Sequence, residues 1–140
     1  MIAIRADSST ILGSGHISRC LTLAKELQRK NFKIVFVCKK SKGSSIELIR
    51  SRGFKVNTIK YFENNKKRAQ EIDADLTIKS FKDSFPSLMI LDHLTLNIFW
   101  HRKIKNYIKK LIVIEDIPSN SSYCDILINQ NLINSKIFYK

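Results

Sequence analysis

The sequence predicts an α/β fold with a doubly wound parallel sheet. Short apolar runs alternate with longer segments that have the period of amphipathic helices. A short loop follows each run, as is typical of connections between strands and helices in such sheets. The run Ile34-Val35-Phe36-Val37 is almost continuously apolar, which indicates a central strand covered on both faces.

Strands and helices are expected to alternate along the whole chain. The predicted strands are 2–6, 33–38, 54–59, 88–91, 111–114 and 126–128. The predicted helices are 16–29, a helix opened by the turn 42–45 and ending at residue 52, two short helices within 64–85, and 97–109.

Two helices in the first half of the chain have clear sequence signals. The first carries Ile17, Leu21 and Ala24 at the i, i+4, i+7 spacing of one apolar face. The second follows an N-cap in the turn 42–45, and Gly53 suits the C′ position after its end.

The second half is less regular. The segment 64–85 is polar with a weak helical period and ends before Pro86. Its expected inner face is Ala69, Ile72 and Leu76. In the helix 97–109 an apolar stripe is expected from Trp100, Ile104 and Ile108, and 117–123 is predicted to be a loop.

The main functional signal lies between Ala3 and Cys20. A strand leads through a polar loop containing Gly13 and Gly15 into a helix, and glycine allows positive φ and close approach of a ligand. Free N–H groups and the positive dipole end of a helix N-terminus favour an anion. His16 lies at this turn, where imidazolium is disfavoured, so a neutral general base is predicted.

The glycine pattern does not indicate a dinucleotide site. Ser18 stands at the third glycine position of that fingerprint. Lys39 and Lys40 stand where an acidic ribose ligand is expected. The sequence therefore argues against NAD.

Three longer motifs occur in order along the chain. They are Arg5-Ala6-Asp7-Ser8 with Gly13-Ser14-Gly15-His16-Ile17-Ser18-Arg19-Cys20-Leu21-Thr22-Leu23-Ala24; Asp92-His93 with Trp100; and Asp116 with Cys124-Asp125 and Asn129-Gln130-Asn131. In these motifs the chain closely resembles the UDP-sugar hydrolases of pseudaminic acid biosynthesis. Spore-coat polysaccharide biosynthesis proteins look similar.

The resemblance implies a domain arrangement. It implies that residues 1–131 form a Rossmann-like domain, the N-terminal half of a two-domain enzyme of the GT-B glycosyltransferase type. It further implies that 132–140 is a hinge or tail, and that the domain holding uridine diphosphate is absent from this chain.

The resemblance also implies the chemistry. The implied substrate is a UDP-linked 2,4-diacetamido-2,4,6-trideoxy sugar, with no cofactor. His16 takes the place of the catalytic histidine, which activates water for attack at the anomeric carbon with inversion. The residues predicted to bind substrate are Arg5, Asp7, Gly13, Gly15, Arg19, Asp92, His93, Asp116 and Asn131.

Structural roles remain open for two of the arginines. Arg5 and Asp7 form either an ion pair or ligand contacts, and Arg19 either meets a phosphate or is solvated. Asp92 next to His93 is a candidate second acid/base pair.

The chain departs from the family pattern at several positions. Leu94 replaces an aromatic residue, Asn97 and His101 replace acidic residues, and Glu115 replaces a second aspartate. Asn120 and Ser122 replace a basic residue and a histidine, and this departure bears most on activity. His101 is expected on a solvated face.

Composition limits the function classes. The net charge is +13, but most of the 25 basic residues are lysines scattered along the chain without interleaved aromatic residues. Nucleic acid is therefore not a favoured partner, and a basic cleft suits an anionic UDP-sugar.

Other classes lack their signals. The sequence shows neither an apolar run of membrane-spanning length nor a signal peptide, so a cytoplasmic protein is expected. Cys20, Cys38 and Cys124 are expected to be free thiols, and no metal-ligand spacing occurs.

Three alternatives to the hydrolase stay open at this stage. The first is a half-domain of a glycosyltransferase that works with a separate polypeptide carrying the nucleotide site. The second is a truncated, inactive domain that binds sugar weakly or not at all. The third is a basic binding module.

Overall fold

The sheet of this protein is wholly parallel. The computed structural model describes residues 1–82, 84–116 and 123–131, and within them six strands form one sheet in the order β3-β2-β1-β4-β5-β6. The strands are β1 (Ile2–Ala6), β2 (Ile34–Lys39), β3 (Lys55–Ile59), β4 (Leu88–Asp92), β5 (Lys110–Ile114) and β6 (Ile126–Ile128). The helices are α1 (Gly15–Arg29), α2 (Ile46–Ser51), α3 (Lys66–Ser80) and α4 (Ile98–Lys105).

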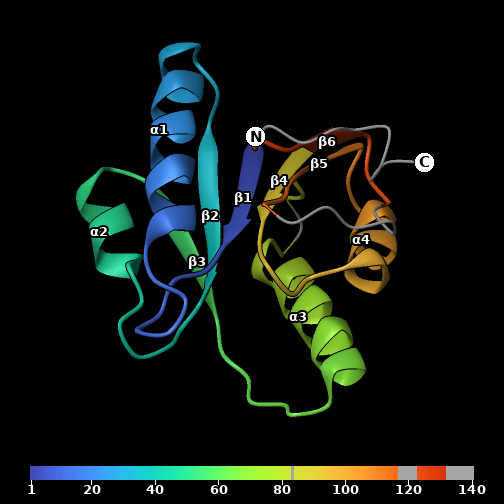
Figure 1. The fold of residues 1–140 in the computed structure, drawn as a ribbon. Coiled ribbons are helices and arrows are strands. Elements are labelled where there is room, and N and C mark those ends of the chain that lie inside the picture. Colours follow the sequence, from blue (N-terminus) through green and yellow to red (C-terminus); the bar gives the residue numbers. More distant parts are fainter. Residues whose placement is uncertain (83, 117–122, 132–140) are drawn as a thin grey trace.

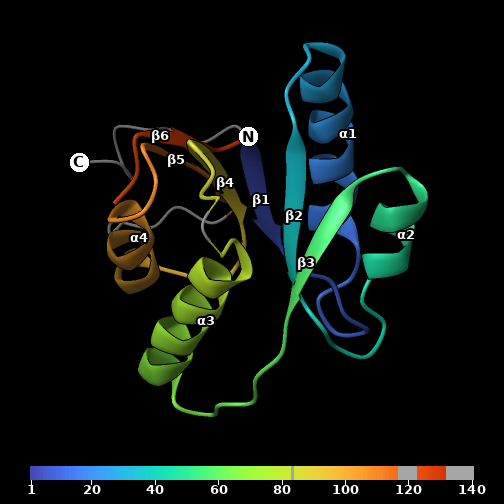
Figure 2. The same cartoon turned by 180° about the vertical axis from the view of Figure 1, so that it is seen from behind.

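Helices cover both faces of the sheet, which confirms the doubly wound α/β fold. In Figures 1 and 2, α1 and α2 lie on one side of the sheet and α3 and α4 on the other. Successive side chains of a strand point to opposite faces, so each strand supplies two cores. Ile4 of β1 packs in the core under α1 and α2, and its neighbour Ala3 packs in the core under α3 and α4. This explains why the central strands β1, β2 and β4 are largely apolar without alternation.

The chain changes direction between β1 and β4. It runs outward from β1 to β3 and then returns to pair β4 with the other edge of β1, with Ala6 opposite Asp92. The loops that leave β1 and β4 therefore diverge to opposite faces of the sheet. In open parallel sheets this switch point, at the carboxyl ends of the strands, is where ligands bind.

The prediction for the inner face of α3 is wrong. The segment forms one helix, not the two short helices predicted, and the buried residues of this helix are Gln70, Asp73, Ala74 and Thr77. The predicted inner-face residues (Ala69, Ile72, Leu76) are only partly buried. A polar face is turned inward because Asp73 compensates the charge of Arg5, which lies in the middle of the sheet.

The end of α4 also differs from the prediction. The helix stops at Lys105 rather than at 109. The stripe of Trp100, Ile104 and Ile108 is buried as predicted, although Ile108 lies beyond the helix. The predicted loop at 117–122, with Asn120 and Ser122, and the predicted tail 132–140 lie outside the described residues.

The β1–α1 loop is fastened to the β2–α2 loop. Thr10 N–H donates to the carbonyl of Lys42 at 3.2 Å, and Ser45 N–H donates to Ser8 Oγ at 2.7 Å. Gly43 has φ +74°, and a Cβ at this position would lie 2.6 Å from Cγ2 of Thr10. The two loops are therefore in close backbone contact.

Candidate active site

His16 and Asp92 form a hydrogen-bonded pair at the switch point. His16 is in the first turn of α1, and Asp92 is the fully buried last residue of β4. His16 Nδ1 lies 2.6 Å from Asp92 Oδ1. Burial raises the pKa of Asp92, but hydrogen bonds from Arg19 and His16 bring it below its usual value. The ionised carboxylate can only accept, so Nδ1 carries the proton and Nε2 of the neutral ring has a free lone pair.

The pKa of His16 is shifted in the direction opposite to the one expected from the helix end. The hydrogen bond to Asp92 raises the pKa of His16, and partial burial and the Arg19 charge oppose this rise only in part. The expectation that the helix end decides the direction of the His16 pKa shift was therefore wrong, because a carboxylate in direct contact outweighs partial charges at a helix end. The neutral base becomes more abundant as the pH rises through the raised pKa.

Arg19 links two carboxylates at this site. Its Nε and Nη2 donate to the two oxygens of Asp92, each at 2.5 Å. Its Nη1 and Nη2 donate to the two oxygens of Asp116 at 2.6 and 3.0 Å. Four of the five N–H donors of the guanidinium are thus occupied by protein carboxylates.

A second histidine–aspartate pair lies beside the first. His93 Nε2 is 3.0 Å from Asp7 Oδ2, and His93 Nδ1 accepts from the N–H groups of Thr95 and Leu96 at 3.1 and 3.3 Å. Both ring nitrogens of His93 are therefore used within the protein. Asp7 Oδ1 also accepts from the N–H of Lys39 at 2.7 Å. This arrangement positions the loop after β4.

Arg5 connects the second pair to the core. It is fully buried, with Nη1 2.5 Å from Asp7 Oδ1 and Nη2 2.6 Å from Asp73 Oδ2. The Asp73 carboxylate also accepts from Tyr61 Oη at 3.0 Å and from Trp100 Nε1 at 2.9 Å. Arg5 and Asp7 thus form the ion pair that the sequence left as one of two alternatives.

Asp73 is the residue that sequence reasoning missed. Two signals could have found it. An arginine inside a buried strand requires a buried carboxylate, because an unpaired charge in the core is very costly. Gln70, Asp73 and Thr77 also follow one helical face.

The two glycines of the loop have different roles. Gly13 has φ +72°, whereas Gly15 begins α1 and is not among the glycines with positive φ. The expectation of positive φ thus holds for Gly13 and not for Gly15. A Cβ at either position would meet no atom within 4 Å.

This difference gives a matched test. Gly13→Ala is expected to lower the free energy of unfolding by about 1 kcal/mol, because alanine disfavours the left-handed region. Gly15→Ala is expected to leave stability unchanged or slightly higher, because alanine favours a helix. Urea unfolding of both variants measures the difference, and equal effects would contradict it.

Asn131 contacts the backbone of Asp116 at the edge of the site. Its Nδ2 donates to the carbonyl of Asp116 at 2.8 Å. Asn131 is itself exposed, so this contact places it at the rim of the group formed by His16, Arg19 and the two carboxylates. Its predicted contact with substrate remains a prediction.

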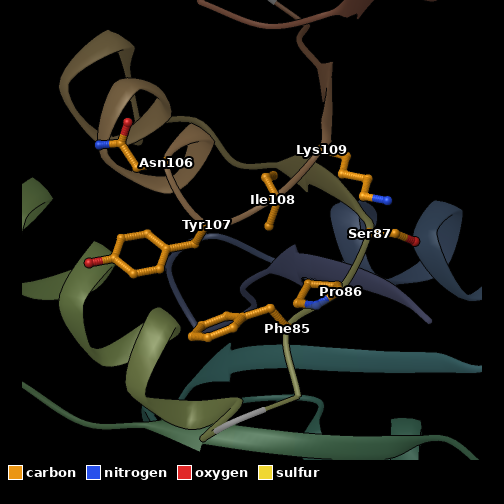
Figure 3. A pocket seen from close by; sticks show the side chains of 7 residues that line it. All are labelled: Phe85, Pro86, Ser87, Asn106, Tyr107, Ile108 and Lys109. Carbon is orange, nitrogen blue, oxygen red and sulfur yellow. The ribbon is translucent and has the colours of Figure 1, made fainter.

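A cavity on the molecule lies away from this group. Figure 3 shows a cavity of about 390 Å³ lined by Phe85, Pro86, Ser87, Asn106, Tyr107, Ile108 and Lys109. Ser87 precedes β4 and Lys109 precedes β5, so the cavity lies at the amino ends of these strands. Its lining contains neither a carboxylate nor an imidazole. It is therefore not the candidate active site.

His101 is buried, and the predicted solvated position is wrong. Only 3% of the residue is exposed, and Nδ1 accepts from the N–H of Tyr123 at 3.3 Å. Its Nε2 has no hydrogen-bond partner among the described residues. Burial lowers the pKa of His101 to about 4. The ring belongs to the core beside Trp100, where a single sequence gave no cue for it.

His101 is expected to make stability depend on pH. The unfolded ring binds a proton below about pH 6.5, whereas the folded ring binds one only near pH 4, so stability falls as the pH drops between these values. The expected loss is on the order of 2–3 kcal/mol. Chemical unfolding at several pH values should show a flatter profile for His101→Gln. An equal slope in the variant would contradict the prediction.

Comparisons with known proteins identify related chains and one related fold. No protein-family model matches the chain. An uncharacterized protein of Methanocaldococcus jannaschii is 34% identical over 98% of this chain and 27% of its own length. A UDP-2,4-diacetamido-2,4,6-trideoxy-beta-L-altropyranose hydrolase of Campylobacter jejuni is 28% identical over 93% of this chain and 41% of its own. The chain thus spans less than half the length of either relative.

The fold also occurs among solved structures. The calicheamicin glycosyltransferase CalG4 superposes with a TM-score of 0.56 over 97% of this chain and 34% of its own, at 14% sequence identity. This likeness shows the fold alone, and it agrees with the sheet and helix layers described above. None of the helices in the described ranges is long and apolar enough to cross a membrane.

Proposed function

We propose that this chain supplies the catalytic base of an enzyme that hydrolyses a UDP-linked 2,4-diacetamido-2,4,6-trideoxy sugar. Nε2 of neutral His16 takes a proton from a water molecule, and the water oxygen bonds to the anomeric carbon. The bond from that carbon to the UDP oxygen breaks with inversion, and UDP leaves with the electron pair. The free sugar suits pseudaminic or related nonulosonic acid biosynthesis.

The observation that carries this proposal is the His16–Asp92 pair at the switch point. Asp92 fixes the Nδ1–H tautomer, which directs the basic lone pair of Nε2 away from the carboxylate. A positioned base of this kind contributes about 10²–10⁴ to a rate. The similarity to the Campylobacter jejuni hydrolase supports the choice of substrate.

The nucleotide site is proposed to lie outside this chain. The two relatives are much longer than the region they share with it. In the proposed enzyme a second domain holds the uridine diphosphate and closes over the carboxyl edge of the sheet. That domain belongs either to a longer form of the protein or to a separate polypeptide.

The test is UDP release from the UDP-linked diacetamido sugar. The chain is assayed alone and then with the C-terminal part of the Campylobacter jejuni hydrolase added, with His16→Ala beside each. Release that needs the added part and disappears in His16→Ala would support the proposal. A folded chain that releases no UDP in either mixture would overturn it and favour an inactive domain.

A second candidate is transfer of the sugar to a hydroxyl acceptor, as in a glycosyltransferase. The fold shared with CalG4 is compatible with it, and the same base would deprotonate the acceptor instead of water. UDP release without any acceptor favours hydrolysis. Release that begins only when a hydroxyl acceptor is added favours transfer.

A further inference from the structure

Four contacts hold the Arg19 guanidinium between two carboxylates. They leave one of its five N–H donors without an oxygen of Asp92 or Asp116. The side chain is 22% exposed, and its two partners come from the ends of β4 and β5. Two opposed forks of this kind fix both the position and the plane of the guanidinium.

The same guanidinium lies against the base. Arg19 Nη2 is 3.1 Å from His16 Nδ1. Nδ1 already carries the proton that it shares with Asp92, so this contact is not a hydrogen bond. It places a permanent positive charge next to a ring that would become positive on protonation.

The charged groups that face His16 act in opposite directions. Asp92, from the end of β4, favours the imidazolium by hydrogen bond and charge. Asp116, following β5, favours it by charge at longer range, and Arg19, from α1 itself, disfavours it. Arg19 is the one cation among the charged groups named here, so without it the two carboxylates would act on His16 unopposed by any of them.

We propose that Arg19 is a positioning residue whose charge limits the protonation of His16 that Asp92 favours. The use of the neutral ring as a base rests on the proposed function, but the effect of Arg19 on the ring does not. Arg19 thus acts through His16 and not by contact with a phosphate.

The test is an NMR titration of the His16 ring in the whole chain. The chain has three histidines, and the signal lost in His16→Gln identifies the right one. Arg19→Gln keeps polar contacts but removes the charge, and it is expected to raise the titration midpoint by about one pH unit. Arg19→Lys keeps the charge and is expected to stay close to the original midpoint. A midpoint that is unchanged or lower in Arg19→Gln would overturn the proposal.

Arg19→Met gives a second reading if Arg19→Gln does not fold. Methionine keeps an unbranched apolar stem at a side chain that is 22% exposed but carries no charge, so the His16 midpoint should again rise. An unchanged or lower midpoint would overturn the inference. If the His16 midpoint follows the Arg19 charge but the chain releases no UDP in any mixture, this inference holds and the proposed function is wrong.

Discussion

Replacing His16 by glutamine is expected to lower UDP release about a thousandfold in the mixture that shows activity. Glutamine keeps a polar side chain at the start of α1, but it cannot accept a proton from water near neutral pH. The measurement is the initial rate of UDP release across the pH range. The original protein should gain activity with increasing pH through the raised pKa of His16.

His93 provides the matched control for this experiment. His93→Gln is the same type of substitution, made at a histidine whose two ring nitrogens both form hydrogen bonds within the protein. We expect it to reduce UDP release by about tenfold or less, through disturbed positioning rather than loss of a base. Equal losses in the two variants would show that His16 has no special role in the reaction.

Replacing Arg5 by methionine is expected to lower the free energy of unfolding by about 3–5 kcal/mol. Methionine fills a similar volume but leaves the carboxylates of Asp7 and Asp73 without their common cation inside the protein. Domains of this size are stable by only about 5–15 kcal/mol, so the variant should be close to unfolding at room temperature. Chemical unfolding followed by circular dichroism measures the loss.

Arg29→Met is the control for Arg5→Met. Arg29 pairs with Glu26 on the exposed face of α1, where both side chains are more than half exposed. Surface pairs of this kind contribute on the order of 0–1 kcal/mol, so no clear loss is expected. Similar losses in both variants would mean that the buried pairing of Arg5 does not carry the stability assigned to it.

The sheet could be predicted because its signals are local. Every strand except β3 contains a short apolar run, and Gly53 marks the end of α2 with its φ of +86°. The inner face of α3 could not be predicted from apolar period alone. That face is set by Asp73 meeting Arg5, a contact between residues far apart in the sequence.

The site was predicted as a set of residues but not as an arrangement. In a doubly wound parallel sheet ligands bind at the carboxyl ends of the strands. The histidines and carboxylates that follow the predicted strands could therefore be assigned to one edge of the sheet. Which histidine meets which carboxylate depends on the register of β1 and β4 and on the orientation of α1. The observed pairs cross between loops, His16 with Asp92 and His93 with Asp7.

The contact between Thr10 and Gly43 has a consequence for binding. A free catalytic loop would lose conformational entropy each time a substrate bound, and that loss would weaken binding. Here the β1–α1 loop is already restrained on folding by its hydrogen bonds to the β2–α2 loop. The loop that leads into His16 is therefore preorganised, and a side chain at position 43 would loosen this loop at a distance from the proposed base.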